Sequence, residues 1–172
     1  MNALYRLQQG LRALGACLWA VDDALAARYL SPPQYRLYRR MSRSERMHSL
    51  RVLRDLLSEG HTQPDLLAAA LLHDVGKTRY PFSLPEKVLV VLVKAVAPRL
   101  YWRWGSGVSE GWRRPFAVSV QHPVWGADMA FHAGSSSLTA TLIRYHAEPP
   151  PPTLPEETAR LLSLLQAADN RN

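Results

Sequence analysis

Apolar residues in this chain recur at steps of three and four, and this period constrains the fold more than any other feature. Steps of three and four place side chains on one face of an α-helix. No segment alternates with a period of two for long enough to form a strand. The sequence therefore predicts an all-α fold. The longest run forms an amphipathic helix that ends near Leu30; its members are Leu4, Leu7, Leu11, Leu14, Leu18, Val21 and Leu25.

Capping residues, prolines and glycines mark the other predicted helices. One helix starts at Ser31 with Pro32 in its first turn, and the next starts at Ser42 or Ser44 and ends before Gly60. Another runs from Pro64 through His73 toward Gly76. The remaining helices are expected from the capping box at Ser83–Glu86 to about Ala97, at about 116–133, at about 136–146, and from the "TLPE" cap at Thr153–Glu156 to Asp169, with an extended connector at Glu148–Pro155.

The domain prediction divides the chain into two parts. Residues 1–41 are interpreted as an N-terminal helical extension packed on the body, and residues 42–172 as the main helical domain. The first helix could instead form a seam with a second copy, so an oligomer through this helix is the alternative. The segment "PRLYWRWGSGVSEGWRRP" at 98–115 is interpreted as a loop or lid. It is either a specificity element, a membrane-surface contact or a plain exposed loop.

Composition limits the class of protein. A chain of 172 residues with 47% hydrophobic and 20% charged residues is long and apolar enough to bury one core. No apolar run approaches the roughly 20 residues that a membrane-spanning helix needs. Cys17 is the single cysteine, which excludes a disulfide framework and a cysteine zinc site. These features favour a reducing compartment and predict a cytoplasmic protein.

The net charge of +7 raises the question of nucleic-acid binding. Basic residues cluster between Arg36 and Arg54, with a smaller group between Arg99 and Arg114. No zinc finger, RNP-type motif or glycine-rich phosphate loop accompanies them, so specific DNA binding is not expected. The basic residues form either a solvated face or a surface that attracts phosphate to an active site, with Arg46 and Arg51 among the candidates.

Helix lengths indicate that several histidines and aspartates meet at one end of the bundle. His48 and His73 are 25 residues apart, on helices that travel about 17 Å out and about 14 Å back at 1.5 Å per residue. His122 and His146 repeat this geometry, with His122 beside Pro123 at an expected helix start. The final helix returns an aspartate to the same end. The converging set is His48, His73, Asp74, His122, His146 and Asp169.

Four imidazoles and two carboxylates exceed the ligand set of one tetrahedral zinc ion. Six nitrogen and oxygen ligands suit two divalent ions such as iron, manganese or another transition metal, with Asp74 able to bridge them. Taken singly, a histidine such as His48 is more often a surface or core residue than a ligand. His61 lies in a turn and His132 at a helix end, so neither is counted as a ligand.

The residues also resemble a known family. The segments "RMHSLRV", "LLAAALLHDVGKT", "QHPVWGADMA", "LIRYHAE" and "LLSLLQAADN" are similar, in this order, to the motifs of the HD-domain metal-dependent phosphohydrolases. The resemblance covers about 42–170. The extended "HHExxDGxGYP" signature of the cyclic-dinucleotide phosphodiesterases is absent, because the chain reads "YHAEPPPP" there. The carboxylate pairs of the alarmone hydrolases are also missing after Asp74.

The resemblance implies an all-helical HD-domain bundle and a role for each matching residue. It implies that His48, His73, Asp74 and Asp169 form the core metal set and that His122 and His146 ligate a second metal. Lys77 would be the phosphate contact and therefore bind substrate. The implied activity is hydrolysis of a nucleotide or related small phosphoester by a metal-activated water, with Asp74, Lys77 and Asp169 as the catalytic residues.

Two other functions fit the same residues. A di-iron oxygenase of the HD type uses the same order of six ligands. A non-catalytic HD module that binds metal or nucleotide in signalling is the third interpretation, favoured by the long N-terminal helix and the basic surface. Bound iron with oxygen consumption and no phosphate release would indicate the oxygenase. A phosphate or nucleotide beside two metals would indicate hydrolysis.

Overall fold

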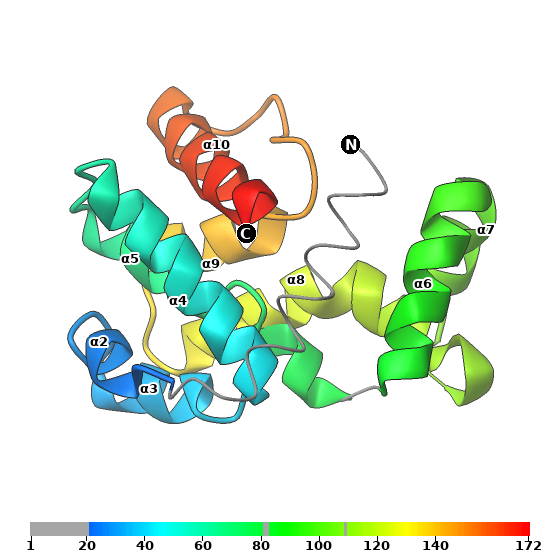
Figure 1. The fold of residues 1–172 in the computed structure, drawn as a ribbon. Coiled ribbons are helices and arrows are strands. Elements are labelled where there is room, and N and C mark those ends of the chain that lie inside the picture. The colour runs from blue at the N-terminus through cyan, green and yellow to red at the C-terminus, as the bar shows by residue number, and fades with distance from the viewer. Residues whose placement is uncertain (1–20, 81–82, 109) are drawn as a thin grey trace.

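The structure is a computed structural model that describes residues 21–172 apart from 81, 82 and 109. Within these residues all regular elements are helices, which confirms the all-α prediction (Figure 1). In chain order they are α2 (Asp23–Ala27), α3 (Pro32–Tyr38), α4 (Arg43–Ser58), α5 (Pro64–Leu72), the 3-10 helix η2 (Val75–Arg79), α6 (Leu84–Val96), α7 (Pro98–Gly105), the 3-10 helix η3 (Gly111–Arg113), α8 (Arg114–His132), α9 (Ser137–Tyr145) and α10 (Glu156–Arg171).

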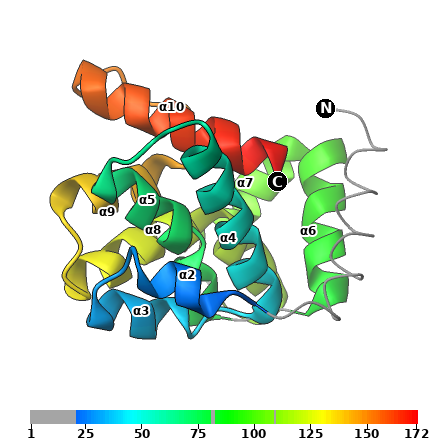
Figure 2. The same cartoon turned by 60° about the vertical axis from the view of Figure 1, so that its left-hand side comes forward.

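Helix α5 is the centre of the bundle. Its residues from Leu66 to Leu72 are all buried, as expected for a helix whose leucines and alanines leave no polar face. Helices α4, α9 and α10 pack against it, and α10 lies across one end of the molecule (Figures 1 and 2). The burial of α5 fixes the place where its C-terminal end, at His73, meets the surrounding helices.

The two expected helical hairpins are present. Helix α4 packs on α5 and α8 packs on α9. Gly60 and Gly134 lie in the turns that follow α4 and α8, with φ angles of +83° and +84°. Glycine adopts this left-handed backbone without the steric cost that a Cβ would add, so each turn can follow its helix directly. The capping box predicted at Ser83 is confirmed as the start of α6. The helix start predicted at Ser42 or Ser44 is found at Ser42, which caps α4.

The prediction of one continuous first helix is wrong where the structure describes it. Helix α2 begins only at Asp23, after the non-helical Asp22, and it ends at Ala27. The Asp22 side chain accepts a hydrogen bond from the backbone N–H of Leu25 and so starts a new helix. The apolar period through Val21 and Leu25 thus spans a helix start, and its earlier part lies outside the described residues.

The segment 98–115 is largely helical, which corrects the prediction of a loop. Pro98 begins α7, and η3 then leads into α8 at Arg114. The aromatic residues organise this region, because the ring of Trp104 contacts those of Trp112 and Phe116 at centroid distances of 5.0 and 5.1 Å. With Val90, Tyr101 and Phe116 buried, α6, α7 and α8 share a second small core.

Two further helix starts differ from the sequence interpretation. Helix α10 begins at Glu156 with Pro155 before it and no side-chain cap, so Thr153 does not cap it. Pro123, expected at a helix start, lies inside α8. None of the helices in the described part of the chain is long and apolar enough to span a bilayer.

Candidate metal centre

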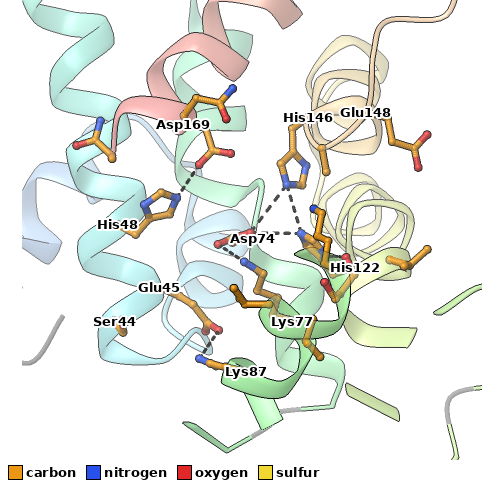
Figure 3. Close-up of a pocket in the computed structure, with 18 of the residues that line it drawn as sticks. Ser44, Glu45, His48, Asp74, Lys77, Lys87, His122, His146, Glu148 and Asp169 are labelled. Carbon is orange, nitrogen blue, oxygen red and sulfur yellow. Dashed lines mark hydrogen bonds and ion pairs between the residues drawn. The ribbon is translucent and has the colours of Figure 1, made fainter. Parts of the chain in front are cut away.

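The structure brings the six predicted histidines and aspartates together. Figure 3 labels all of them except His73. His48 lies on α4, His73 and Asp74 follow α5, and His122 lies on α8. His146 follows α9, and Asp169 lies on α10. Side chains from five separate parts of the chain therefore meet at one place. The packing of α4, α9 and α10 on α5, and of α8 on η2 and α9, brings them there.

Three of these residues form a first group of metal-capable atoms. His48 Nε2 lies 2.8 Å from Asp169 Oδ1 and 3.3 Å from His73 Nε2. His73 Nε2 lies 3.6 Å from the same oxygen of Asp169. One ligand atom from each residue thus faces a common point, and the group could hold a metal ion.

A second group meets the first at Asp74. Asp74 Oδ1 lies 3.4 Å from His122 Nε2 and 3.9 Å from His146 Nε2, and these two nitrogens are 3.3 Å apart. The other oxygen, Oδ2, lies 3.7 Å from His73 Nε2. The Asp74 carboxylate therefore presents one oxygen to each group, as a carboxylate that bridges two metal ions would.

Backbone carbonyls select the ring nitrogen that faces the cluster. The Nδ1 atoms of His73 and His146 lie 3.0 Å from the carbonyl of Ala70 and 2.7 Å from that of Ile143. Because a carbonyl oxygen can only accept, each Nδ1 carries the proton and donates it. The Nε2 atom is then left with its lone pair toward the cluster, as a metal ligand requires.

Pro123 supplies the corresponding partner for His122. A proline inside a helix has no N–H with which to bond the carbonyl four residues earlier, here that of Ser119. His122 Nδ1 lies 3.0 Å from this carbonyl and 3.1 Å from that of Val118, and it donates to them. The acceptor that Pro123 leaves open is thus occupied by the adjacent histidine, whose Nε2 faces Asp74.

Two glycines allow the backbone around Asp74 to touch α8. A Cβ atom on Gly76 would lie 2.0 Å from the carbonyl oxygen of His122 and 2.7 Å from the backbone nitrogen of Gly126. Real Cβ atoms do not approach backbone atoms this closely, so only glycine fits at this position. The close contact sets the separation of Asp74 and His122.

Burial and neighbouring charges determine the protonation of the cluster. Burial lowers the pKa of His146 to about 3, and it also lowers the pKa of His122. Burial acts in the opposite sense on Asp74, but Lys77 and His73 hold the pKa of its carboxyl well below the ordinary value. Neutral imidazoles and ionised carboxylates are the forms that bind metal ions.

Lys77 lies at the edge of this cluster, within a cavity of about 530 Å³. Its Nζ is 2.7 Å from Asp74 Oδ2, and its side chain is part-buried. The cavity wall opposite the cluster comes from α6 and α7. Tyr101 and Trp102, from the 98–115 segment, belong to this wall. The cavity is also lined by Glu45 on α4 and by Lys87 and Lys94 on α6, which the sequence interpretation did not single out.

Of the two arginines predicted to attract phosphate, only one lines the cavity. Arg51 lines the cavity, whereas Arg46 pairs with Asp23 at 2.5 Å. Lys87 and Lys94 lie seven residues apart on α6, which is the spacing of one helix face and the signal that could have identified them. His61 lies near Glu59 and His132 donates to the carbonyl of Asp128, so neither joins the cluster.

The comparison with protein families gives one result. The family described as HD domain matches residues 46–171, which include every member of the histidine and aspartate cluster. No curated protein and no solved structure matches the chain. The matched region covers well over half of the chain and runs from the first turn of α4 to the end of α10. The all-helical arrangement of this region is consistent with an HD-domain bundle. The chain therefore belongs to the HD domain family.

Proposed function

We propose that this chain is a metal-dependent phosphohydrolase that cleaves a nucleotide or related small phosphoester. The observation that carries the proposal is the Asp74 carboxylate, whose Oδ2 faces His73 of the first group and whose Oδ1 faces His122 of the second. Members of the HD family are typically phosphohydrolases of this kind. The cavity of about 530 Å³ beside the cluster has a size suited to a small substrate.

The donor set fits divalent ions. His48, His73 and Asp169 would hold one ion and His122 and His146 a second, with Asp74 shared between them. Ions bound there would lower the pKa of a coordinated water and offset negative charge on the phosphoryl group. Burial lowers the pKa values of His146 and His122, which favours their neutral form, and Nδ1 hydrogen bonds orient three of the four imidazoles.

The other proposed roles belong to Lys77 and Asp169. The Lys77 ammonium lines the cavity and would donate to a non-bridging phosphate oxygen. It now donates to Asp74, so the same side chain also offsets the buried carboxylate. Asp169 faces the cavity from α10 and would accept a hydrogen bond that orients the attacking water. Arg51 and Lys87 in the wall would attract an anionic substrate.

The test compares Asp74→Asn with Asp128→Asn. Both changes remove one carboxylate charge, but Asp128 is exposed and lies outside the cluster. Protein purified without chelators is analysed for metal and assayed on a panel of phosphomonoesters, phosphodiesters and nucleotides. We expect Asp74→Asn to lose bound metal and phosphate release while its helix content stays unchanged, and Asp128→Asn to keep both.

A second variant separates metal binding from catalysis. Lys77→Met should keep its metal and lose turnover, because Lys77 is proposed to contact phosphate and not metal. Retention of metal by Asp74→Asn would disprove the bridging role. Bound iron with oxygen consumption and no phosphate release would replace the proposal by an oxygenase, and bound metal with no turnover on any substrate would replace it by a binding module.

A further inference from the structure

Exposed apolar side chains are concentrated on α6, α7 and η3. Among the described residues, the large hydrophobic side chains that are exposed fall mostly between Leu84 and Trp112, with Val124 and Phe131 elsewhere. We call this surface the α6–α7 face; its principal members are Leu84, Val88, Leu92, Val96, Leu100, Trp102 and Trp112. Figure 1 shows α6 and α7 side by side at one edge of the molecule.

The α6 part of this face is a regular stripe. Leu84, Val88, Leu92 and Val96 follow one another at steps of four, which places them along one side of the helix. Their exposed fractions run from 52% to 80%. Val90, on another side of the helix, is buried against the small core. A helix that is apolar on so many sides is normally covered, so this stripe indicates a contact surface.

The charge of the same region indicates what kind of partner it contacts. Between Ser83 and Arg114 the chain carries six basic and two acidic residues. One of the acids, Glu86, lies 3.7 Å from Arg114. Arg99, Arg103 and Arg113 are exposed around the aromatic residues, and Arg113 lies over the ring of Trp112. The face is therefore both apolar and positive, and its complement is apolar and negative.

We propose that the α6–α7 face binds the surface of an anionic phospholipid bilayer. The stripe on α6 would enter the boundary between headgroups and acyl chains, as the apolar side of an interfacial helix does. Trp102 and Trp112 are the side-chain type that prefers the headgroup level. The long arginine side chains reach the anionic headgroups, and each basic residue near such a surface adds to binding.

Charge argues against two other occupants of the face. A second copy of this chain would bring an equally basic face against it. Residues 1–20 carry an apolar stripe in sequence, but they also carry Arg6 and Arg12 and no acidic residue. Either occupant would bury apolar surface while adding like charge. An anionic bilayer is both apolar and negatively charged at its surface region, as the face requires, and binding to it needs no membrane-spanning helix.

The proposal does not depend on the activity of the metal centre. Helices α6 and α7 also supply Val90, Lys94 and Trp102 to the cavity wall, so the bilayer would lie beside the entrance to the cavity. Vesicle binding is measured without substrate, and metal content is measured separately. A failure of one proposal is therefore distinguishable from a failure of the other.

The experiment is co-sedimentation of the full chain with two kinds of vesicle. One contains phosphatidylcholine alone, and the other also contains phosphatidylglycerol. We expect binding to the anionic vesicles at low ionic strength and a loss of binding as salt screens the attraction. The double variant Val88→Asp/Leu92→Asp should weaken binding by about tenfold or more, because it places charge in the stripe. The matched variant Val124→Asp/Phe131→Asp should bind as the unchanged chain does.

A second pair of variants tests the charge without altering apolar packing. Arg99→Ser/Arg103→Ser should weaken anionic binding several-fold, while Arg36→Ser/Arg40→Ser, with the same loss of exposed charge elsewhere, should weaken it less. Unchanged helix content and metal content verify the fold. The proposal is overturned by equal binding to both kinds of vesicle, by no binding at low ionic strength, or by a dimer that dissociates in Val88→Asp/Leu92→Asp.

Discussion

The histidines of the cluster depend on the ring nitrogen that faces away from the cluster as much as on the one that faces it. In His73, His122 and His146 the nitrogen that faces away is Nδ1, and it donates to a backbone carbonyl within the same turn. Such a partner fixes the ring and raises its basicity as a ligand. In α8 the partner carbonyl of Ser119 is open because Pro123 cannot bond to it.

Pro123→Ala tests this role. Alanine would supply a backbone N–H to the Ser119 carbonyl and compete with His122 Nδ1 for it. We expect metal affinity to fall by roughly 10- to 100-fold, the usual cost of losing the partner of a ligating histidine. Thermal stability of the metal-free protein should not fall, because an interior proline disfavours a helix. The readouts are metal titration and a thermal melt.

Pro115→Ala is the matched control for this change. Pro115 lies in the first turn of α8, where a backbone N–H has no helical partner in any case. Its replacement should leave metal affinity unchanged. Equal affinities for Pro123→Ala and the unchanged chain would mean that the Ser119 carbonyl does not orient His122.

At the scale of elements, the contact between η2 and α8 holds the two ligand groups at their separation. Gly76→Ala would place a Cβ 2.0 Å from the carbonyl oxygen of His122, and because the atoms it meets belong to the backbone of α8, no cheap adjustment is possible. We expect a loss of about 1–3 kcal/mol in the free energy of unfolding, as for overpacking in a core. Bound metal should fall as well, because Asp74 and His122 move apart.

Gly107→Ala provides the comparison for Gly76→Ala. The nearest atom to a Cβ at Gly107 is the carbonyl oxygen of Trp104 at 3.8 Å, which is an ordinary contact. Chemical denaturation and metal analysis of the two variants separate a steric effect at η2 from a general effect of alanine. A Gly76→Ala protein with unchanged stability and metal content would contradict the proposed packing role.

Capping residues, prolines and glycines predicted most of the helices, and each wrong helix boundary has a physical cause that can be named. The capping box at Ser83 and the candidate start at Ser42 identified helix starts because the side chains that satisfy the first N–H groups lie close to them in sequence. Pro123 misled because a proline usually marks a helix start, and its open carbonyl is satisfied here by a histidine side chain. The segment 98–115 misled because its tryptophans pack on one another and on Phe116, which composition does not reveal.

At the scale of the whole molecule, the cluster could be anticipated because helix length converts spacing in sequence into distance. Two hairpins of similar length return His73 to His48 and His146 to His122. The cavity wall could not be anticipated in this way. Lys94 and Trp102 reach it through the packing of α6 and α7 on α8, and that packing depends on contacts between side chains distant in sequence.

The cluster also links folding to pH in the metal-free protein. The pKa of His146 is about 3 in the folded chain, whereas a histidine in an unfolded chain has a pKa near 6.5. Above about pH 6.5 both states are neutral, so this residue adds no pH dependence. Below it the unfolded chain takes up a proton that the folded chain does not, and stability falls as pH falls toward 3. Burial lowers the pKa of His122 as well, so it acts in the same direction.

We therefore expect the free energy of unfolding of the metal-free protein to be level between pH 8 and 7. It should then decrease by about 1 kcal/mol per pH unit through His146 between pH 6 and 5, and His122 should add to the decrease. Asp74, whose pKa is also held below its ordinary value, adds a further loss below about pH 4. Chemical denaturation across this range measures the slope. His146→Gln should flatten it more than His132→Gln, which makes the same change outside the cluster. A level curve down to pH 5 would mean that His146 and His122 gain protons in the folded state as easily as in the unfolded one, and the buried cluster would then not be held ready for metal.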